Sequence, residues 1–236
     1  MRLFTPFTIP KKENCDLCRI KTNKRKATEN RFLDQLFKFL YRDSLISFST
    51  DLEHNSKGGF EMRLNFVPTH VFRETPQVSF FDAGVKGCNG SDVVIHHGNA
   101  ISPPNDGDFE QYYVHRHQID HNLVIEGSRV FTLINPEWDE PHHIIYLNRA
   151  MGALQIPVGT YHRSISNKEG SIVLNQAVRD EEFNPENEFI PVSLRDRKDL
   201  QEAQKKNPVY WVWEKDQIKR IKLDPIKSKK KALSKL

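Results

Sequence analysis

Residues 156–162 read Ile-Pro-Val-Gly-Thr-Tyr-His, and an earlier segment, residues 115–117, reads His-Arg-His. Pro157 and Gly159 predict a tight turn between two strands, with His162 at the start of the second strand. Because alternate residues of an extended strand share a face, the two histidines of the earlier segment point the same way. On an exposed loop they would simply face solvent. Inside a barrel, two neighbouring imidazoles would both need polar partners. A metal ion would satisfy them, because each ring can give it a nitrogen lone pair.

The segments around these motifs have the rhythm of short β-strands. Residues 61–67 alternate polar and apolar side chains and stop at Pro68. No segment within residues 60–180 shows helical periodicity over the length of a helix. Many short strands separated by turn residues predict an all-β sandwich or barrel. Further strands are expected at residues 77–81, 92–96, 111–117, 122–125, 129–134, 144–148, 153–156 and 171–178.

The two flanks of this region have a different character. Residues 29–42 carry apolar side chains at helical spacing, which predicts an amphipathic helix. Residues 195–206 indicate a short surface helix, and residues 209–223 indicate a hairpin. We therefore expect three parts, which are an N-terminal extension with the amphipathic helix at 1–59, a barrel at 60–180, and a C-terminal extension with a basic tail at 181–236.

The order H-x-H and then P-x-G-x-x-H resembles the two motifs of the cupin superfamily. The first motif is residues 115–117, followed by a glycine turn at Gly127, and the second is residues 157–162. The resemblance covers residues 110–180 and extends back to residue 60. It implies an all-β fold, a cupin-type antiparallel β-barrel of the kind also called a double-stranded β-helix or jelly roll.

The resemblance also implies a set of metal ligands, and at one position this chain departs from the family pattern. The family's first motif usually carries glutamate three or four residues after its second histidine, where this chain has His121 and Asn122. Counting back from Gly127 instead brings Asp120 to that position. His121 shares the parity of the earlier histidines if the strand runs straight, so it is favoured as fourth ligand, with Asp120 or an incomplete three-histidine site as alternatives. The expected ligands are His115, His117, His121 and His162.

A site rich in imidazole suits a divalent transition metal such as iron, nickel, zinc, copper or manganese. Three or four protein ligands leave coordination positions open for substrate, water or dioxygen, as in catalytic sites. Tyr113 and Gln155 are expected to orient the ligand rings through their second nitrogens. The resemblance implies a metal-dependent enzyme of the dioxygenase or oxidoreductase type that acts on a small molecule.

Two other functions are compatible with the same residues. Some cupin-like enzymes that remodel nucleotide-linked sugars have a similar H-x-H strand and a Gly-Ser turn, here Gly127-Ser128. In such a metal-free isomerase or epimerase, His115 or His117 would act as general acid or base. Tyr161 and Asp120 are the candidate catalytic residues besides them. Positive charge for the substrate would come from Arg116, Arg149, Arg163 and Arg179. The third function is a non-enzymatic metal-binding or small-molecule-binding protein.

The net charge of +4 hides an acidic body between two basic ends. Residues 31–204 carry a net charge of −9, whereas residues 1–30 and 205–236 are basic. An acidic body disfavours nucleic acid as a partner, because neutralisation of phosphates dominates that affinity. The basic residues near the C-terminus have the composition of a solvated chain end.

Membrane insertion and disulfides are also disfavoured. No apolar run approaches the ~20 residues that a membrane-spanning helix needs. The three cysteines do not form the two pairs typical of a structural zinc site, and their scarcity favours a reducing, cytoplasmic location. A homodimer is implied by the resemblance, with residues 32–40 or the strand at 211–213 as an apolar interface or as a cover for the chain's own barrel.

Overall fold

A computed structural model describes residues 64–222. The N-terminal extension up to residue 63, with its predicted helix at 29–42, and the basic tail after residue 222 lie outside the described residues. No helix of the described part is long and apolar enough to cross a membrane. The strands are β1 (Asn65–Val67), β2 (His70–Glu74), β3 (Ser79–Asp82), β4 (Gly90–His96), β5 (Ile101–Ser102), β6 (Gln111–Tyr112), β7 (Gln118–Ile134), β8 (His142–Leu147), β9 (Ala153–Ile156), β10 (Tyr161–Arg179), β11 (Val192–Ser193), β12 (Val209–Glu214) and β13 (Gln217–Lys222). Two short helices, α2 (Pro185–Glu188) and α3 (Lys198–Gln204), follow the barrel strands.

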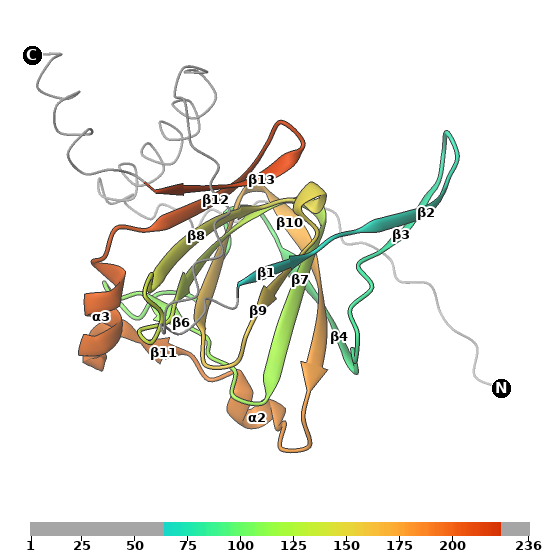
Figure 1. Ribbon diagram of the computed structural model, residues 1–236. Helices are drawn as coiled ribbons and strands as arrows, with labels where there is room; N and C mark the ends of the chain where they lie inside the picture. Colours follow the sequence, from blue (N-terminus) through green and yellow to red (C-terminus); the bar gives the residue numbers. More distant parts are fainter. Residues whose placement is uncertain (1–63, 223–236) are drawn as a thin grey trace, which may run out of the picture. The chain divides into compact units, whose positions relative to one another are not determined.

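The predicted all-β fold is confirmed. Nine strands form one curled sheet with the order β1-β9-β7-β8-β12-β13, and β10 adds to β7 while also pairing β4 and β5. All pairings are antiparallel except the one between β12 and β8. The long strands β7 and β10 run through the centre of this arrangement in Figure 1.

The pairing of β7 with β10 changes register where both strands bend. Ser166 pairs with Arg129, and the next pair is Ser171 with Gly127. Gly127 and Gly170 both have positive φ values, and a Cβ on Gly127 would lie 2.6 Å from the carbonyl oxygen of Gly170. Glycine is needed at this close approach of two backbones. The bend gives each long strand two halves, and these lie in different parts of the curled sheet.

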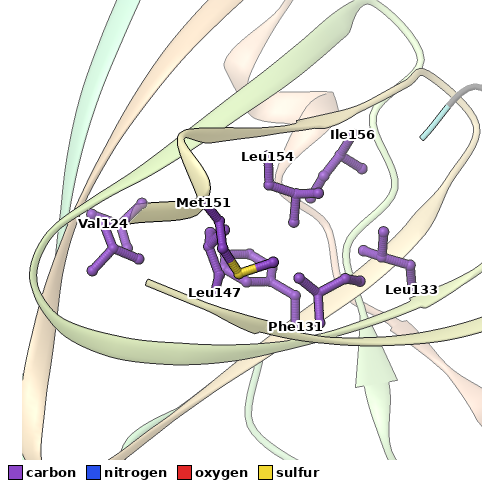
Figure 2. Close-up of a cluster of buried hydrophobic side chains, with 9 residues drawn as sticks. Val124, Phe131, Leu133, Leu147, Met151, Leu154 and Ile156 are labelled. Carbon is purple, nitrogen blue, oxygen red and sulfur yellow. The ribbon is translucent and has the colours of Figure 1, made fainter. Parts of the chain in front are cut away.

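The hydrophobic core fills the barrel between the two halves of the long strands. Its side chains alternate along each strand with outward-facing ones, as period-two strands require. Trp211 and Trp213 of β12 pack against this core, so that strand covers the chain's own barrel. The buried members are Val124, Phe131, Leu133, Ile145, Leu147, Met151, Leu154, Ile156 and Val173, most of them labelled in Figure 2.

The expected C-terminal hairpin forms from β12 and β13. A second apolar cluster joins α3 to the outside of the barrel through Leu200, Tyr112 and Ile134, all fully buried. The segment after residue 180 thereby extends and covers the barrel. The predicted division into parts at residues 59 and 180 stays a prediction.

Candidate active site

The two histidine motifs meet at one end of the barrel. His115 precedes β7, and His162 lies near the start of β10, where its backbone N–H and C=O bond those of Tyr113 at 2.8 and 2.9 Å. The N–H of Gly159, in the turn before β10, donates to the carbonyl oxygen of His115 at 2.8 Å. These backbone bonds place the rings of His115 and His162 with their centroids 4.9 Å apart. Both side chains are buried.

Asp120 is the third member of this cluster. Its Oδ2 lies 3.5 Å from Nε2 of His115 and 3.7 Å from Nε2 of His162. Its Oδ1 accepts hydrogen bonds from the side-chain amides of Gln118 at 2.6 Å and Asn175 at 2.9 Å. One carboxylate oxygen is thus fully occupied by amides, and the other is aimed at the two imidazoles.

A second carboxylate lies on the other side of His115. The buried Glu188, at the end of α2, places Oε2 3.4 Å from Nδ1 of His115 and accepts the backbone N–H of Arg116 at 2.8 Å. The same Nδ1 donates to the carbonyl oxygen of Glu188 at 3.1 Å. The ring of Phe189 meets that of His115 edge-on, with centroids 5.2 Å apart. Both nitrogens of His115 therefore lie near carboxylate or carbonyl oxygens, an environment that favours the protonated ring.

The two histidines have opposite preferences for a proton. Burial lowers the pKa of His115, but hydrogen bonding and the charges of Asp120 and Glu188 outweigh it and hold this pKa above its usual value. Burial, followed by the charge of His115, lowers the pKa of His162 to about 4. Burial raises the pKa of Asp120, but its contacts with the two histidines hold the pKa of this carboxyl well below its usual value.

His162 is held in one tautomer as well. Its Nδ1 donates to the carbonyl oxygen of Thr160 at 3.2 Å, so the neutral ring carries a bare lone pair on Nε2. This nitrogen and Nε2 of His115 both lie near Oδ2 of Asp120. The cluster therefore presents one nitrogen that can give a proton and one that can take it.

The structure does not bring His117 to this cluster. The chain bends at Arg116 and His117 before β7 begins, so the strand that was expected to run straight is interrupted. His117 turns toward solvent, where its Nδ1 lies 3.1 Å from Oδ2 of Asp180 and its side chain is 30% exposed. The bend also resets the alternation of faces, so Asp120 rather than His121 lies beside His115.

His121 lies on the opposite face of β7 from Asp120. Its backbone N–H donates to Oδ1 of Asn175, and its Nδ1 donates to the carbonyl oxygen of Gln176 at 3.1 Å. The β7–β10 register has no pair at His121, so these side-chain bonds replace bonds of the ladder. His121 is a structural residue, and the expected four-histidine set is corrected to His115, His162 and Asp120. Asp120 was the alternative left open by the sequence.

The candidate proton donor Tyr161 also points away from the pocket. It packs against the second apolar cluster, and its hydroxyl accepts a hydrogen bond from Arg197 at 2.8 Å. The tyrosine beside the histidines is Tyr113, whose ring centroid lies 6.3 Å from that of His162. Gln155, the other residue expected to orient a ligand ring, pairs with His121 and bonds Asn65 instead.

The four arginines expected near the substrate are mostly engaged elsewhere. Arg163 is buried and bonds Glu110 at 2.9 Å, and the guanidinium of Arg149 lies over the ring of Phe81. Arg179 bonds Asp92 and Gln118. Arg116 alone among the four has an exposed side chain next to the histidine cluster.

Sequence reasoning missed Glu188 and Phe189. They come from the acidic segment after residue 180, which reads as exposed and lies far along the chain from His115. In Figure 1, α2 lies at one end of the barrel. Glu188 of α2 and Phe189, which follows it, both contact His115. One glutamate among several in an acidic segment, followed by an apolar pair, carries no signal for such a contact.

The topology and the two motifs agree on one fold. Curled antiparallel strands enclose the core, and the H-x-H and P-x-G-x-x-H segments place their histidines together at one end. The barrel is a cupin-type jelly roll. No family model and no curated protein matches the sequence of this chain.

Solved structures resemble this chain in part, at low sequence identity. A sugar 3,4-ketoisomerase from Thermoanaerobacterium thermosaccharolyticum, in complex with TDP, is 14% identical, with 61% of this chain and 96% of that one covered and a TM-score of 0.44. A 3,4-ketoisomerase from Helicobacter canadensis is 17% identical, with 60% and 98% covered and a TM-score of 0.41. A dTDP-4-dehydrorhamnose 3,5-epimerase from Elizabethkingia anophelis is 13% identical, with 66% and 88% covered and a TM-score of 0.41.

The expected dioxygenase or oxidoreductase function is corrected. The similar structures named above are sugar ketoisomerases or epimerases rather than oxidoreductases. The ligand set that motivated the expectation also does not form, because His117 and His121 leave the cluster. Ligand atoms of His115, Asp120 and His162 do lie within 4.8 Å of one another, a spacing that an ion could bridge. A divalent metal held by these three residues stays a prediction.

Proposed function

We propose that this cupin is a metal-free isomerase or epimerase that moves a proton next to the carbonyl group of a nucleotide-linked keto sugar. The observation that carries the proposal is the cluster in which Asp120 faces both His115 and His162. Paired groups whose environments push their pKa values apart are typical of an acid and a base in one site. The names of the similar structures supply the substrate class that this proposal adopts.

The chemistry needs two proton-handling groups at one place. A base removes the proton from the carbon beside the carbonyl, and the electron pair of the broken C–H bond moves onto the carbonyl oxygen as an enolate. Return of a proton to the same carbon from the opposite face gives an epimer, and return through an enediol to the neighbouring carbon gives an isomer. The bare Nε2 of His162 and the protonated Nε2 of His115 offer the accepting and donating groups.

The supporting residues keep this pair ready. The Asp120 carboxylate stabilises the positive charge on His115, and the carbonyl oxygen of Thr160 fixes the tautomer of His162. Because the charge of His115 lowers the pKa of His162, the pair rather than either residue would set the pH profile of the reaction. A divalent ion held by the same three residues would supply Lewis acidity but would occupy the nitrogens that handle the proton, so the proposed transfer belongs to the metal-free site.

Deuterium incorporation tests the proposal directly. The full-length protein is incubated in D₂O with a panel of nucleotide-linked 4-keto sugars, and proton NMR follows loss of the signal beside the carbonyl. We expect exchange with at least one member and a loss of about 10²–10⁴-fold in His115→Gln and in His162→Gln. His117→Gln is the matched control and should exchange at the wild-type rate. Absence of exchange with the whole panel, or an unaffected His115→Gln variant, would contradict the proposal.

We also propose that the protein is a homodimer, formed through the outer face of the β10–β4 sheet. Val93 and Ile95 of β4 are 64% and 52% exposed, and they pair across the sheet with Leu174 and Ile172. Within residues 64–222, β4 has a strand partner on one edge only. An apolar sheet face with a free edge suits packing against its own copy about a two-fold axis.

Light scattering after size exclusion tests the dimer. We expect a dimeric wild-type protein and a monomeric Val93→Asp variant, because a buried carboxylate without a partner is costly. Ile190→Asp is the control, since Ile190 is 59% exposed but lies after α2. A monomeric wild-type protein would refute the dimer.

A further inference from the structure

The buried side chain of Gln118 links the site to an arginine outside it. Its amide nitrogen Nε2 donates to Oδ1 of Asp120 at 2.6 Å, and its oxygen Oε1 accepts from Nε of Arg179 at 2.7 Å. A carboxylate can only accept and a guanidinium can only donate. One orientation of the Gln118 amide therefore satisfies both neighbours, and Gln118 is 1% exposed, so water does not offer a substitute.

Arg179 is itself fixed from three sides. Its Nη2 bonds Oδ2 of Asp92 on β4 at 2.7 Å. Its guanidinium carbon lies 4.3 Å from the ring centroid of Phe183. A Cβ added to Gly90 would lie 2.5 Å from this carbon, so the guanidinium fills the space that the glycine leaves. Strand β4, strand β10 and the segment before α2 together define one position for this side chain.

We propose that Arg179 is a positioning residue, which holds the Gln118 amide so that the Asp120 carboxylate stays aimed at His115 and His162. The catalytic consequence of this role rests on the proposed function, whereas the hydrogen bonds of Gln118 with Asp120 and Arg179 are present without a substrate. It differs from the expectation that Arg179 contacts a substrate, because two of its guanidinium nitrogens are bonded to Gln118 and Asp92. Asn175 holds the same Oδ1 from the other side, so Asp120 keeps one amide donor when Gln118 is released.

Two variants disturb Arg179 in different ways. Arg179→Met removes the donor to Gln118 and the charge beside Asp92. Gly90→Ala keeps every hydrogen-bonding group but places a methyl group where the guanidinium lies, and the φ of Gly90 is not in the left-handed region. Arg73→Met is the matched control, because the guanidinium of Arg73 also lies over a phenylalanine ring, in the β2–β3 hairpin.

The readout is the side-chain amide of Gln118 in ¹⁵N NMR spectra of the full-length protein, assigned by its loss in Gln118→Ala. We expect slow hydrogen exchange in the wild type and exchange at least about tenfold faster in Arg179→Met and Gly90→Ala, because the amide is released from a buried network. Arg73→Met should match the wild type. Unchanged protection in the folded Gly90→Ala variant would overturn the proposal, whether or not Arg179→Met folds.

A second measurement separates this inference from the proposed function. With a substrate that exchanges deuterium, both variants should lower kcat while leaving KM close to the wild-type value, because the substrate still binds but Asp120 is misdirected. A raised KM with unchanged kcat would indicate that Arg179 contacts the substrate and would also overturn the inference. If the amide is released but no substrate exchanges even in the wild type, the positioning role stands and the proposed function fails.

Discussion

Oδ2 of Asp120 lies 3.5 Å from Nε2 of His115, although the two residues have opposite sequence parity. On one straight strand they would face opposite sides of the sheet. The bend at Arg116 and His117 brings them to the same side. The Asp120 carboxylate in this contact is held by the amides of Gln118 and Asn175. The other ring nitrogen of His115 bonds the carbonyl oxygen of Glu188.

Replacing Asp120 with asparagine should lower the pKa of His115. The charge and hydrogen bonding that outweigh burial at His115 come first from Asp120, so burial should dominate once that charge is gone. Titration of the His115 ring by NMR measures the change. Asp180→Asn is the control, since Asp180 contacts the exposed His117 instead. A pKa of His115 that does not fall in Asp120→Asn would show that Asp120 is not the dominant partner.

His121→Ala should destabilise the protein by about 1–3 kcal/mol, whereas His117→Ala should stay within about 0.5 kcal/mol of the wild type. The alanine at position 121 leaves the carbonyl oxygen of Gln176 without its partner inside the sheet. His117 is partly exposed, and its two partners, Asp180 and Glu182, are both exposed. Urea denaturation gives both free energies of unfolding, and equal losses would contradict the structural role of His121.

The free energy of unfolding should fall as the pH is lowered from about 6.5 toward 4. Burial lowers the pKa values of His96, His143 and His162 to about 4, so the unfolded chain binds protons in this window that the folded chain does not. Each such histidine adds a slope of up to about 1.4 kcal/mol per pH unit. His115, with its raised pKa, acts in the opposite sense, because its contribution is largest at low pH and fades as the pH rises.

Denaturation at several pH values tests this dependence. His96→Gln should flatten the slope by up to the contribution of one histidine, because His96 is buried with only its Nδ1 bonded, to Ser166. Stability that does not change between pH 7 and pH 5 would mean that the folded protein takes up these protons without cost.

Removal of metal should leave deuterium exchange unchanged. The proposed proton transfer uses the lone pair of His162 and the proton of His115, and it does not depend on an ion at these residues. Elemental analysis of the purified protein and exchange assays before and after dialysis against a chelator make the comparison. Activity that disappears on dialysis and returns with one added metal would show that the sequence-based expectation of a metal at this cluster is correct.

The fold and half of the site could be predicted from the sequence, because turn chemistry and strand alternation are local. The turn at Pro157 and Gly159 places His162 at the mouth of the barrel, and the H-x-H segment brings His115 opposite it. The choice between Asp120 and His121 depended on the backbone between positions 115 and 120. Arg116 and His117 give no local signal for a bend. A straight strand would place His121 on the face of His115, whereas the bend places Asp120 there.

Other parts of the site depend on contacts between distant segments. Glu188 reaches His115 because α2 crosses the end of the barrel, and Arg179 reaches Gln118 because Gly90 leaves room for it. Neither pairing follows from periodicity or composition. Tyr161 was a reasonable proton donor by its position beside His162, but neighbours on a strand point to opposite faces.

The bend at Arg116 and His117 makes the site sensitive to chain length rather than to residue type at these positions. The side chains there can vary, because Arg116 is exposed and His117 is partly exposed. A deletion or insertion of a single residue between His115 and Gln118 would shift the phase of the strand and turn the Asp120 carboxylate away from His115. In this chain, the spacing of five residues between His115 and Asp120 therefore defines the site more directly than the H-x-H pattern does.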